Sequence, residues 1–190
     1  MKPLVLVHGF MGGSEQWNLQ EPLGANRELI KVDLPGFGRN AHLEPIDSIK
    51  NFADWVLAQV KTEEFDLLGH SMGGMIVQEM TRLAPERVDR LILYGTGSIG
   101  DLPGRFEPIE TSIERATVDG AIATARRISA TWFLQQDKAA QYKNCAAIAE
   151  QSRLPAITAG LKAMRDWSGR DNLTNISVPT LVLWGDRDVR

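Results

Sequence analysis

Cysteine occurs only once in the 190 residues, at Cys145, so the chain can form no intramolecular disulfide. A single cysteine agrees with a reducing compartment. Apolar runs are short as well: none approaches the roughly 20 residues of a membrane-spanning helix. The N-terminal run Leu4–Val7 is too short for the core of a signal peptide. These shortages favour a soluble, cytoplasmic protein with no membrane partner.

Clustered positive charge is also missing. The 21 Lys and Arg residues are scattered along the chain and are outnumbered by 24 Asp and Glu residues. Nucleic acids bind concentrated basic surfaces, so we expect no nucleic-acid partner. The spacings typical of metal ligands and of a G-x-G-x-x-G phosphate loop do not occur. We therefore expect no metal and no other cofactor, and we interpret Cys145 as a packing residue within a helical stretch.

Short apolar runs alternate with segments of helical period. A helix is predicted over residues 49–60, where apolar residues recur at i, i+3, i+4 and i+7 after an N-cap at Asp47 or Ser48. A second helix is predicted over residues 72–84. The alternation predicts an α/β fold with a mostly parallel, doubly wound sheet and right-handed crossovers. The predicted strands are Leu4–Val7, Leu29–Val32, Phe65–Leu68, Leu91–Tyr94 and Leu181–Trp184.

Between Tyr94 and Val178 the chain carries helical patterns and no convincing strand. Because these helices have apolar stripes of their own, we interpret the region as a helical cap rather than a linker. Trp132 and Phe133, at the end of the first helix, could face the core of the cap or the cleft. The predicted cap helices cover residues 122–133, 138–151 and 155–167. The predicted domains are a first core part (1–96), the cap (97–176) and a core strand with its turn (177–190).

The residues Gly69-His70-Ser71-Met72-Gly73 form a G-x-S-x-G motif between a predicted strand and a predicted helix. In that setting the serine sits on a sharp turn that exposes its Oγ at the carboxyl end of the sheet. Small residues two before and two after it avoid collisions where the backbone folds back. The helix that starts there directs its free N–H groups toward developing negative charge. We therefore predict that Ser71 is a nucleophile.

Acyl transfer needs two hydrogen-bond donors for the oxyanion. The backbone N–H of Met72, directly after the nucleophile, is one candidate. The backbone N–H of Phe10 is the other, in the turn His8-Gly9-Phe10 that closes the first strand. Since both roles use the backbone, we expect the side chains of Phe10 and Met72 to line the acyl pocket.

Four segments together resemble the α/β-hydrolase fold family, in family order. They are V-L-V-H-G-F at 5–10, D-L-P-G-F-G at 33–38, G-H-S-M-G-G at 69–74 and P-T-L-V-L-W-G-D-R-D at 179–188. Within the family the chain is most similar to small serine esterases, enol-lactonases and C–C bond hydrolases that carry a helical cap. Asn40 departs from the pattern, because many relatives have serine there.

The resemblance implies that the catalytic acid lies in the turn G-x-x-D after the last predicted strand. Carried over to this chain, the acid is Asp188, with Asp186 as the competing choice. Asp33, which follows the second strand, is interpreted as a residue that orders a loop.

The family order places the histidine base after the acid, but His8, His42 and His70 all precede Asp188. His8 belongs to the oxyanion turn, and the side chain of His70 is expected to point away from Ser71. His42, in a loop, is the remaining alternative. We expect the base to lie beyond Arg190, together with a last strand and helix of the sheet, in a longer enzyme.

These features predict a cofactor-free serine hydrolase of a small carboxylic ester, lactone or related carbonyl compound, with little activity in the 190 residues alone. Alternatives are a non-catalytic ligand-binding protein on the same fold, and a C–C hydrolase, lyase or acyltransferase that uses the same serine. Anionic substrates would call for cationic groups in the cap, where Arg126, Arg127 and Arg153 are available. An uncovered sheet edge at Leu181–Trp184 would favour self-association.

Overall fold

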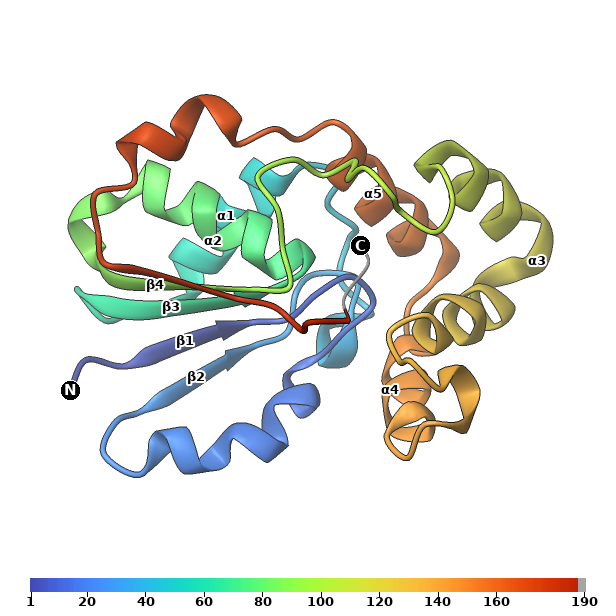
Figure 1. Cartoon of the computed structure of the whole chain (residues 1–190), viewed down its shortest axis with the longest axis horizontal. Helices are drawn as coiled ribbons and strands as arrows, with labels where there is room; N and C mark the ends of the chain where they lie inside the picture. Colours follow the sequence, from blue (N-terminus) through green and yellow to red (C-terminus); the bar gives the residue numbers. More distant parts are fainter. Residues whose placement is uncertain (188–190) are drawn as a thin grey trace.

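The computed structural model describes residues 1–187, so Asp188 lies outside the described residues. Five strands form one sheet in the order β2-β1-β3-β4-β5, and all four neighbouring pairs are parallel (Figure 1). The strands are β1 (Leu4–Val7), β2 (Leu29–Val32), β3 (Phe65–His70), β4 (Val88–Tyr94) and β5 (Thr180–Leu183). The predicted parallel α/β sheet is confirmed.

The α-helices are α1 (Ile49–Gln59), α2 (Met72–Leu83), α3 (Ile109–Ala130), α4 (Tyr142–Ala149) and α5 (Leu154–Arg165). Shorter 3₁₀ segments are η1 (Ser14–Gly24), η2 (Gly38–Asn40), η3 (Pro85–Arg87), η4 (Gln136–Lys138) and η5 (Arg170–Asn175). Within residues 1–187, no helix has the length and apolar character needed to cross a bilayer.

The order of the strands explains which face each connection covers. The step from β1 to β2 runs in one direction across the sheet, and the later steps run in the other. Because crossovers are right-handed, the two directions place their connections on opposite faces. Helices α1 and α2 cover one face, and on the other Trp17 of η1 packs against Leu4, Leu6 and Leu68 (Figure 1). The direction reverses between β1 and β3, and at such a point open α/β sheets bind ligands outside the carboxyl ends of their strands.

The two predicted core helices are confirmed. Helix α1 begins after Ser48, whose hydroxyl oxygen accepts a hydrogen bond from the N–H of Asn51. This contact settles the choice between Asp47 and Ser48 as the N-cap. Helix α2 begins directly after Ser71 and ends at Leu83, close to the predicted end.

The helical region after β4 differs from the prediction in its boundaries. Helix α3 starts at Ile109, well before the predicted start, and it is kinked at Gly120, which has a φ of 79°. One helix was predicted over residues 138–151. The structure instead has the 3₁₀ segment η4, which ends at Lys138, and the shorter helix α4, and Gln136 within η4 has a φ of 50°. Trp132 packs against the main apolar cluster. Figure 1 shows α3, α4 and α5 together at the end of the molecule toward which the strands point.

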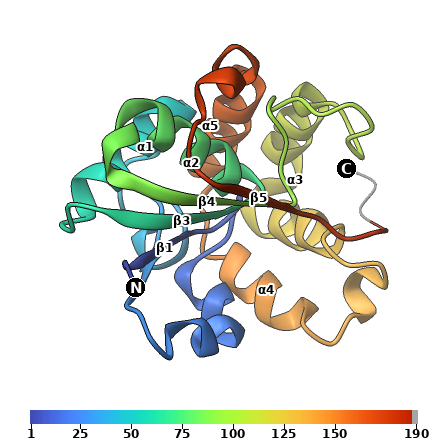
Figure 2. The same cartoon turned by 60° about the vertical axis from the view of Figure 1, so that its left-hand side comes forward.

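Strand β5 lies at one edge of the sheet, paired with β4 on one side only within residues 1–187 (Figure 2). The apolar side chains of Leu181, Val182 and Leu183 are 51%, 51% and 44% exposed. A strand of this kind presents free backbone groups and apolar surface to other chains.

We predict that residues 1–190, prepared as an isolated chain, self-associate through β5, because pairing would bury apolar side chains and satisfy the backbone groups of the strand edge. Light scattering should detect dimers or larger species. The substitution Val182→Lys, which puts a charge at the edge, should shift them toward monomer. A monodisperse monomer of the unaltered protein would contradict the prediction.

Candidate active site

Ser71 occupies the sharp turn between β3 and α2. Its backbone has φ 54° and ψ −122°, a sparsely populated conformation that costs about 1–3 kcal/mol for a residue with a side chain. Hydrogen bonds hold it on both sides. The Ser71 N–H donates to the Tyr94 carbonyl at 3.0 Å, and the Ser71 carbonyl accepts from the Gly74 N–H at 2.8 Å. The turn keeps Ser71 half-buried at the carboxyl end of β3.

Gly69 and Gly73 lie where other segments of the backbone approach too closely to leave room for a side chain. A Cβ added at Gly69 would collide with the Gly73 carbonyl oxygen and would lie 2.6 Å from Val77 Cγ2. A Cβ at Gly73 would collide with the Val7 carbonyl oxygen and would lie 2.5 Å from that of His8. Neither clash could be relieved without moving backbone. The steric need for small residues two before and two after Ser71 is therefore present in the structure.

The turn after β1 lies beside Ser71. The Gly12 N–H donates to the Gly9 carbonyl at 3.0 Å, and Met11 is fully buried with a φ of 53°, in the left-handed region. A Cβ added at Gly9 would be 3.1 Å from Ser71 Cβ. The tight turn thus brings residues 8–10 next to the predicted nucleophile, although more than 60 residues separate them in the sequence.

The two predicted oxyanion donors flank this point. Met72 is the first residue of α2, so its N–H has no acceptor within the helix. Within residues 1–187, nothing accepts a hydrogen bond from the Phe10 N–H. The side chains of both residues are buried: Met72 is fully enclosed, and the Phe10 ring packs edge-on against Phe37 with centroids 5.8 Å apart. That these side chains line an acyl pocket stays a prediction.

His8 is fully buried, and both of its ring nitrogens are engaged. Nε2 accepts a hydrogen bond from the Leu34 N–H at 3.0 Å, so Nδ1 carries the proton and donates to the Gly9 carbonyl at 2.7 Å. Burial lowers the pKa of His8 to about 4, against smaller opposing effects from Gly9 and Asp33. His8 is therefore a neutral clamp between the β1 turn and the loop after β2.

Asp33 orders that loop, in agreement with the sequence interpretation. Its Oδ1 accepts hydrogen bonds from the N–H groups of Ser14, at 2.8 Å, and Arg39, at 3.3 Å. Asn40, the departure from the family pattern, donates from Nδ2 to the Asp33 carbonyl at 2.6 Å. A carboxylate bound in this way fixes the loop to the chain that follows the β1 turn.

The helical region contacts both of these loops. A Cβ at Gly160 of α5 would be 2.9 Å from the Phe10 ring, and one at Gly13 would be 3.0 Å from Ile148 Cγ2 of α4. Cys145 of α4 is half-buried, and burial raises the pKa of its thiol. These contacts agree with a packing role for Cys145 and place α4 and α5 against the turn beside Ser71. The division into a core and a cap domain stays a prediction.

The other two histidines, His42 and His70, lie in different surroundings. His42 is exposed, and its carbonyl accepts a hydrogen bond from Arg153 at 3.2 Å. The ring of His70 packs on Tyr94 with centroids 5.0 Å apart, and its Nδ1 would be 3.3 Å from a Cβ added at Gly9. The expectation that the His70 side chain points away from Ser71 is left as a prediction.

The predicted acid turn follows β5. Asp188 lies outside the described residues, and the competing Asp186 is exposed in the turn. The Gly95 N–H donates to the Leu183 carbonyl at 2.8 Å, while the neighbouring Tyr94 carbonyl accepts from Ser71. The end of β5 is thus joined through β4 to the turn that bears Ser71.

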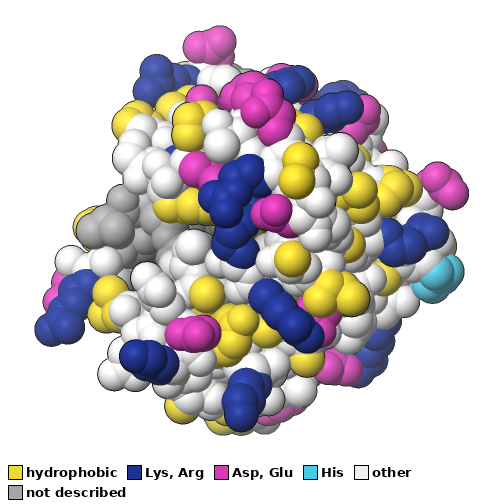
Figure 3. Space-filling model, turned by 90° about the vertical axis from the view of Figure 1, so that its right-hand side faces the viewer, with side chains coloured by type: hydrophobic (Ala, Val, Ile, Leu, Met, Phe, Trp, Pro, Cys, Tyr) yellow, Lys and Arg dark blue, Asp and Glu magenta, His cyan; other side chains and the backbone are white. Residues whose placement is uncertain are grey.

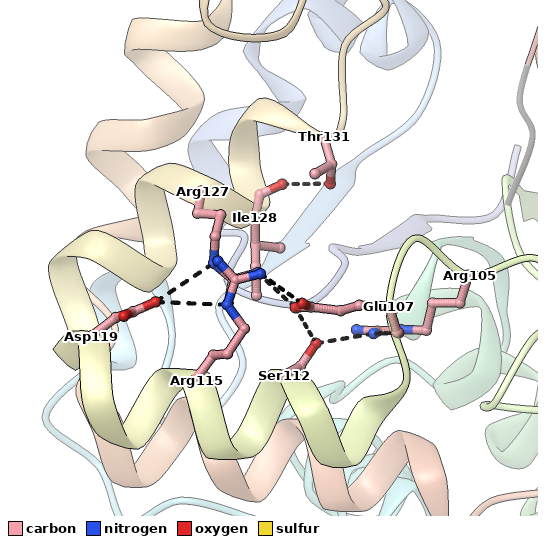
Figure 4. Close-up of polar contacts among 8 residues, drawn as sticks. All are labelled: Arg105, Glu107, Ser112, Arg115, Asp119, Arg127, Ile128 and Thr131. Atoms are coloured by element: carbon pink, nitrogen blue, oxygen red, sulfur yellow. Dashed lines mark hydrogen bonds and ion pairs between the residues drawn. The ribbon is translucent and has the colours of Figure 1, made fainter.

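The three arginines considered for an anionic substrate are all engaged in internal contacts. Arg126 pairs with Glu150 at 2.7 Å, and Arg153 binds the carbonyls of the loop at residues 41–43. Arg127 pairs with Glu107 at 2.6 Å and lies 3.9 Å from Asp119 (Figure 4). The view of this end of the molecule in Figure 3 shows basic, acidic and hydrophobic side chains interspersed.

Glu107 is the centre of this network, which connects the two halves of the kinked α3 (Figure 4). It accepts hydrogen bonds from Ser112 at 2.7 Å and from Arg115 at 3.0 Å, in addition to Arg127. Burial opposes ionisation of Glu107, but the hydrogen bonds from Ser112, Arg127 and Arg115 outweigh it, so the pKa of this carboxyl is lowered. The network therefore supports the shape of α3 rather than presenting free cations.

Ser71 lines neither of two open hollows on the surface of the described residues. One of about 420 Å³ is lined by Lys61, Glu64 and Arg87 among others, and one of about 520 Å³ by residues 134–138. Neither contains a predicted site residue, so the catalytic assignment rests on the turns and not on a cavity.

Sequence reasoning missed Thr96, which contacts the turn directly. Its hydroxyl donates to the Ser71 carbonyl at 2.8 Å. The only local signal is its position between Gly95 and Gly97 after β4, and such a loop has no distinctive pattern.

Comparisons with known proteins find relatives that align with nearly the whole chain. Pimeloyl-[acyl-carrier protein] methyl ester esterase of Pseudoalteromonas atlantica is 30% identical, over 97% of this chain and 75% of that protein. A bifunctional biotin-biosynthesis protein of Teredinibacter turnerae is 27% identical, over 97% of this chain. The acetyltransferase component of the acetoin cleaving system of Pseudomonas putida is 29% identical, over 98% of this chain. The chain spans only 36% and 52% of the lengths of the latter two relatives.

Solved structures share the fold. The enol-lactonase of Burkholderia xenovorans superposes with a TM-score of 0.86 at 18% identity, covering 97% of this chain and 73% of that one. An esterase of Thermogutta terrifontis gives a TM-score of 0.80 at 25% identity, covering 97% and 71%. A family model described as the alpha/beta hydrolase fold matches residues 2–189. With its parallel sheet and the turn at Ser71, the chain belongs to the α/β-hydrolase fold family.

Proposed function

We propose that the protein is a serine hydrolase of small carboxylic esters, lactones or related carbonyl compounds, with Ser71 as the nucleophile. One observation carries the proposal: the strained turn at Ser71 lies directly beside the Gly9 turn, at the carboxyl ends of β3 and β1. Acyl transfer needs a nucleophile and two hydrogen-bond donors near one carbonyl group, and this neighbourhood supports the Ser71 hydroxyl and the N–H groups of Phe10 and Met72 for those roles. The similarity to a methyl ester esterase and to an enol-lactonase supports this class of substrate.

In the proposed reaction Ser71 Oγ attacks the substrate carbonyl carbon, and an imidazole accepts the hydroxyl proton. The negative oxygen that forms is stabilised by the N–H groups of Phe10 and Met72 and by the amino end of α2. Collapse releases the alcohol, which takes the proton from the imidazolium, and water then hydrolyses the acyl ester by the same steps.

In this reaction Asp188 orients the imidazole, and the imidazole belongs to a histidine other than the three in these residues. His8 is unsuited to the role because both of its ring nitrogens already hold the two loops together. Protonation of its buried ring is also costly, as the lowered pKa indicates.

Covalent labelling tests the assignment of Ser71. The protein, both as residues 1–190 and as any longer chain that its gene encodes, is incubated with a fluorophosphonate and digested for mass spectrometry. We expect an adduct on Ser71, none in Ser71→Ala, and an unchanged adduct in Ser177→Ala, where an exposed serine away from the turn is replaced.

Absence of the adduct from every unaltered chain would contradict the assignment. An ester ligand that binds without being consumed would then favour the non-catalytic binding protein. If Ser71 is labelled, analysis of the products separates hydrolysis from lyase or acyltransferase chemistry.

A further inference from the structure

The carbonyl of Ser71 receives three hydrogen bonds, and only one of them comes from a side chain. The N–H groups of Gly74 and Met75 donate at 2.8 Å and 3.3 Å, and both belong to the first turn of α2. The third donor is Thr96 Oγ1 at 2.8 Å, from the loop after β4. We infer that Thr96 is a positioning residue that holds the strained backbone of Ser71 in its reactive conformation. This inference rests on the proposed function.

Contact with a second residue of the turn restricts Thr96 further. A Cβ added at Gly74 would lie 2.5 Å from Thr96 Cβ and 2.6 Å from its Oγ1, so the threonine side chain packs directly on the α2 backbone. The Thr96 hydroxyl therefore binds Ser71, and the rest of the Thr96 side chain packs on Gly74 in the same turn. A side chain of the same shape without the hydroxyl can separate the two effects.

The loop that carries Thr96 is itself braced. Gln78 of α2 donates from Nε2 to the carbonyls of both Gly74 and Gly97, each at 3.0 Å. On the other side the Gly95 N–H donates to the Leu183 carbonyl at 2.8 Å. Thr96 is thus held between α2 and the end of β5, and it can resist movement of Ser71 relative to the strand that precedes the predicted acid.

Loss of the hydroxyl is expected to misplace the nucleophile rather than to weaken substrate binding. A residue in a sparsely populated conformation keeps it only while its surroundings over-determine it. Displacement of a reacting group by about 1 Å can slow a reaction by about 10²-fold. We therefore expect Thr96→Val to lower kcat, and the rate constant for fluorophosphonate labelling of Ser71, by roughly 10- to 100-fold, with KM changed by less than about 2-fold.

The experiment compares four forms of the chain that gives the fastest labelling: unaltered, Thr96→Val, Thr96→Ser and Thr81→Val. Thr96→Ser keeps the hydroxyl and should restore most of the rate. Thr81 is the matched control, because it is a buried threonine of α2 whose hydroxyl donates to the Val77 carbonyl, also at 2.8 Å, away from Ser71. Thr81→Val should leave the labelling rate unchanged.

The outcomes distinguish this inference from the function on which it rests. If the unaltered protein is not labelled at Ser71, both are overturned. If it is labelled and Thr96→Val reacts as fast as Thr96→Ser, only the positioning role is overturned. The same holds if Thr96→Val and Thr81→Val lose rate equally, or if the loss lies in KM alone.

Discussion

Residues 1–190 by themselves are expected to hydrolyse an activated aryl ester such as p-nitrophenyl acetate about 10⁶-fold more slowly than a chain that supplies a histidine base. That factor is the cost of removing the histidine of a serine triad in subtilisin. Without a base, Ser71 must attack as a neutral hydroxyl, which is a poor nucleophile at pH 7. The donors at Phe10 and Met72 would remain, and such sites retain a residual acceleration of roughly 10³–10⁴ over water.

The substitution Ser71→Ala should have different effects in residues 1–190 alone and in a chain that supplies the histidine base. In residues 1–190 it should change the initial rate little, because the catalytic groups no longer act as a unit. In a chain that includes the base, it should abolish turnover. Rapid turnover by residues 1–190 that depends on Ser71 would show that the base is among their own histidines, and His42 and His70 would then be replaced one at a time.

The folded protein should lose about 3 kcal/mol of stability from His8 alone as the pH falls from 6.5 toward 4. The folded state holds the buried imidazole neutral, with its pKa lowered from 6.5 to about 4. The unfolded chain binds this proton near pH 6.5, so acid favours unfolding throughout that window. Each pKa unit corresponds to about 1.4 kcal/mol. The contribution is complete above pH 6.5, decreases through the window, and changes no further below pH 4.

Urea unfolding at pH 7.5, 6.5, 5.5 and 4.5 measures this effect. His8→Gln serves as the control, because an amide can accept the Leu34 N–H bond and does not titrate. The variant should be less stable at pH 7.5 but should show a shallower loss between pH 6.5 and 4.5. A His8 imidazole that titrates near pH 6.5 in NMR spectra of the folded protein would contradict the prediction.

The sequence by itself determined the features that depend on neighbouring residues. Apolar runs and helical periodicity predicted the parallel sheet and helices α1 and α2, because period and capping are properties of consecutive side chains. The glycines around Ser71 were interpretable for the same reason, since a Cβ there meets backbone of the same turn or of the adjoining strand. The helical region was predicted less well: Gln136 and Gly120 have positive φ and interrupt helical segments, and the spacing of apolar residues does not mark such positions.

Only the tertiary structure decided how residues distant in the sequence act on one another. His8 and Leu34 are 26 residues apart, Thr96 and Ser71 are 25 apart, and Arg127 and Glu107 are 20 apart. No local pattern marks such pairs, because they meet only when the loops at the carboxyl ends of β1, β2, β3 and β4 and the two halves of α3 fold together. In the folded chain, the neutral His8 ring joins two loops, Arg127 pairs with Glu107, and the Thr96 hydroxyl binds the Ser71 carbonyl. The chemistry of each side chain was visible in the sequence, but its partner was set by the three-dimensional packing.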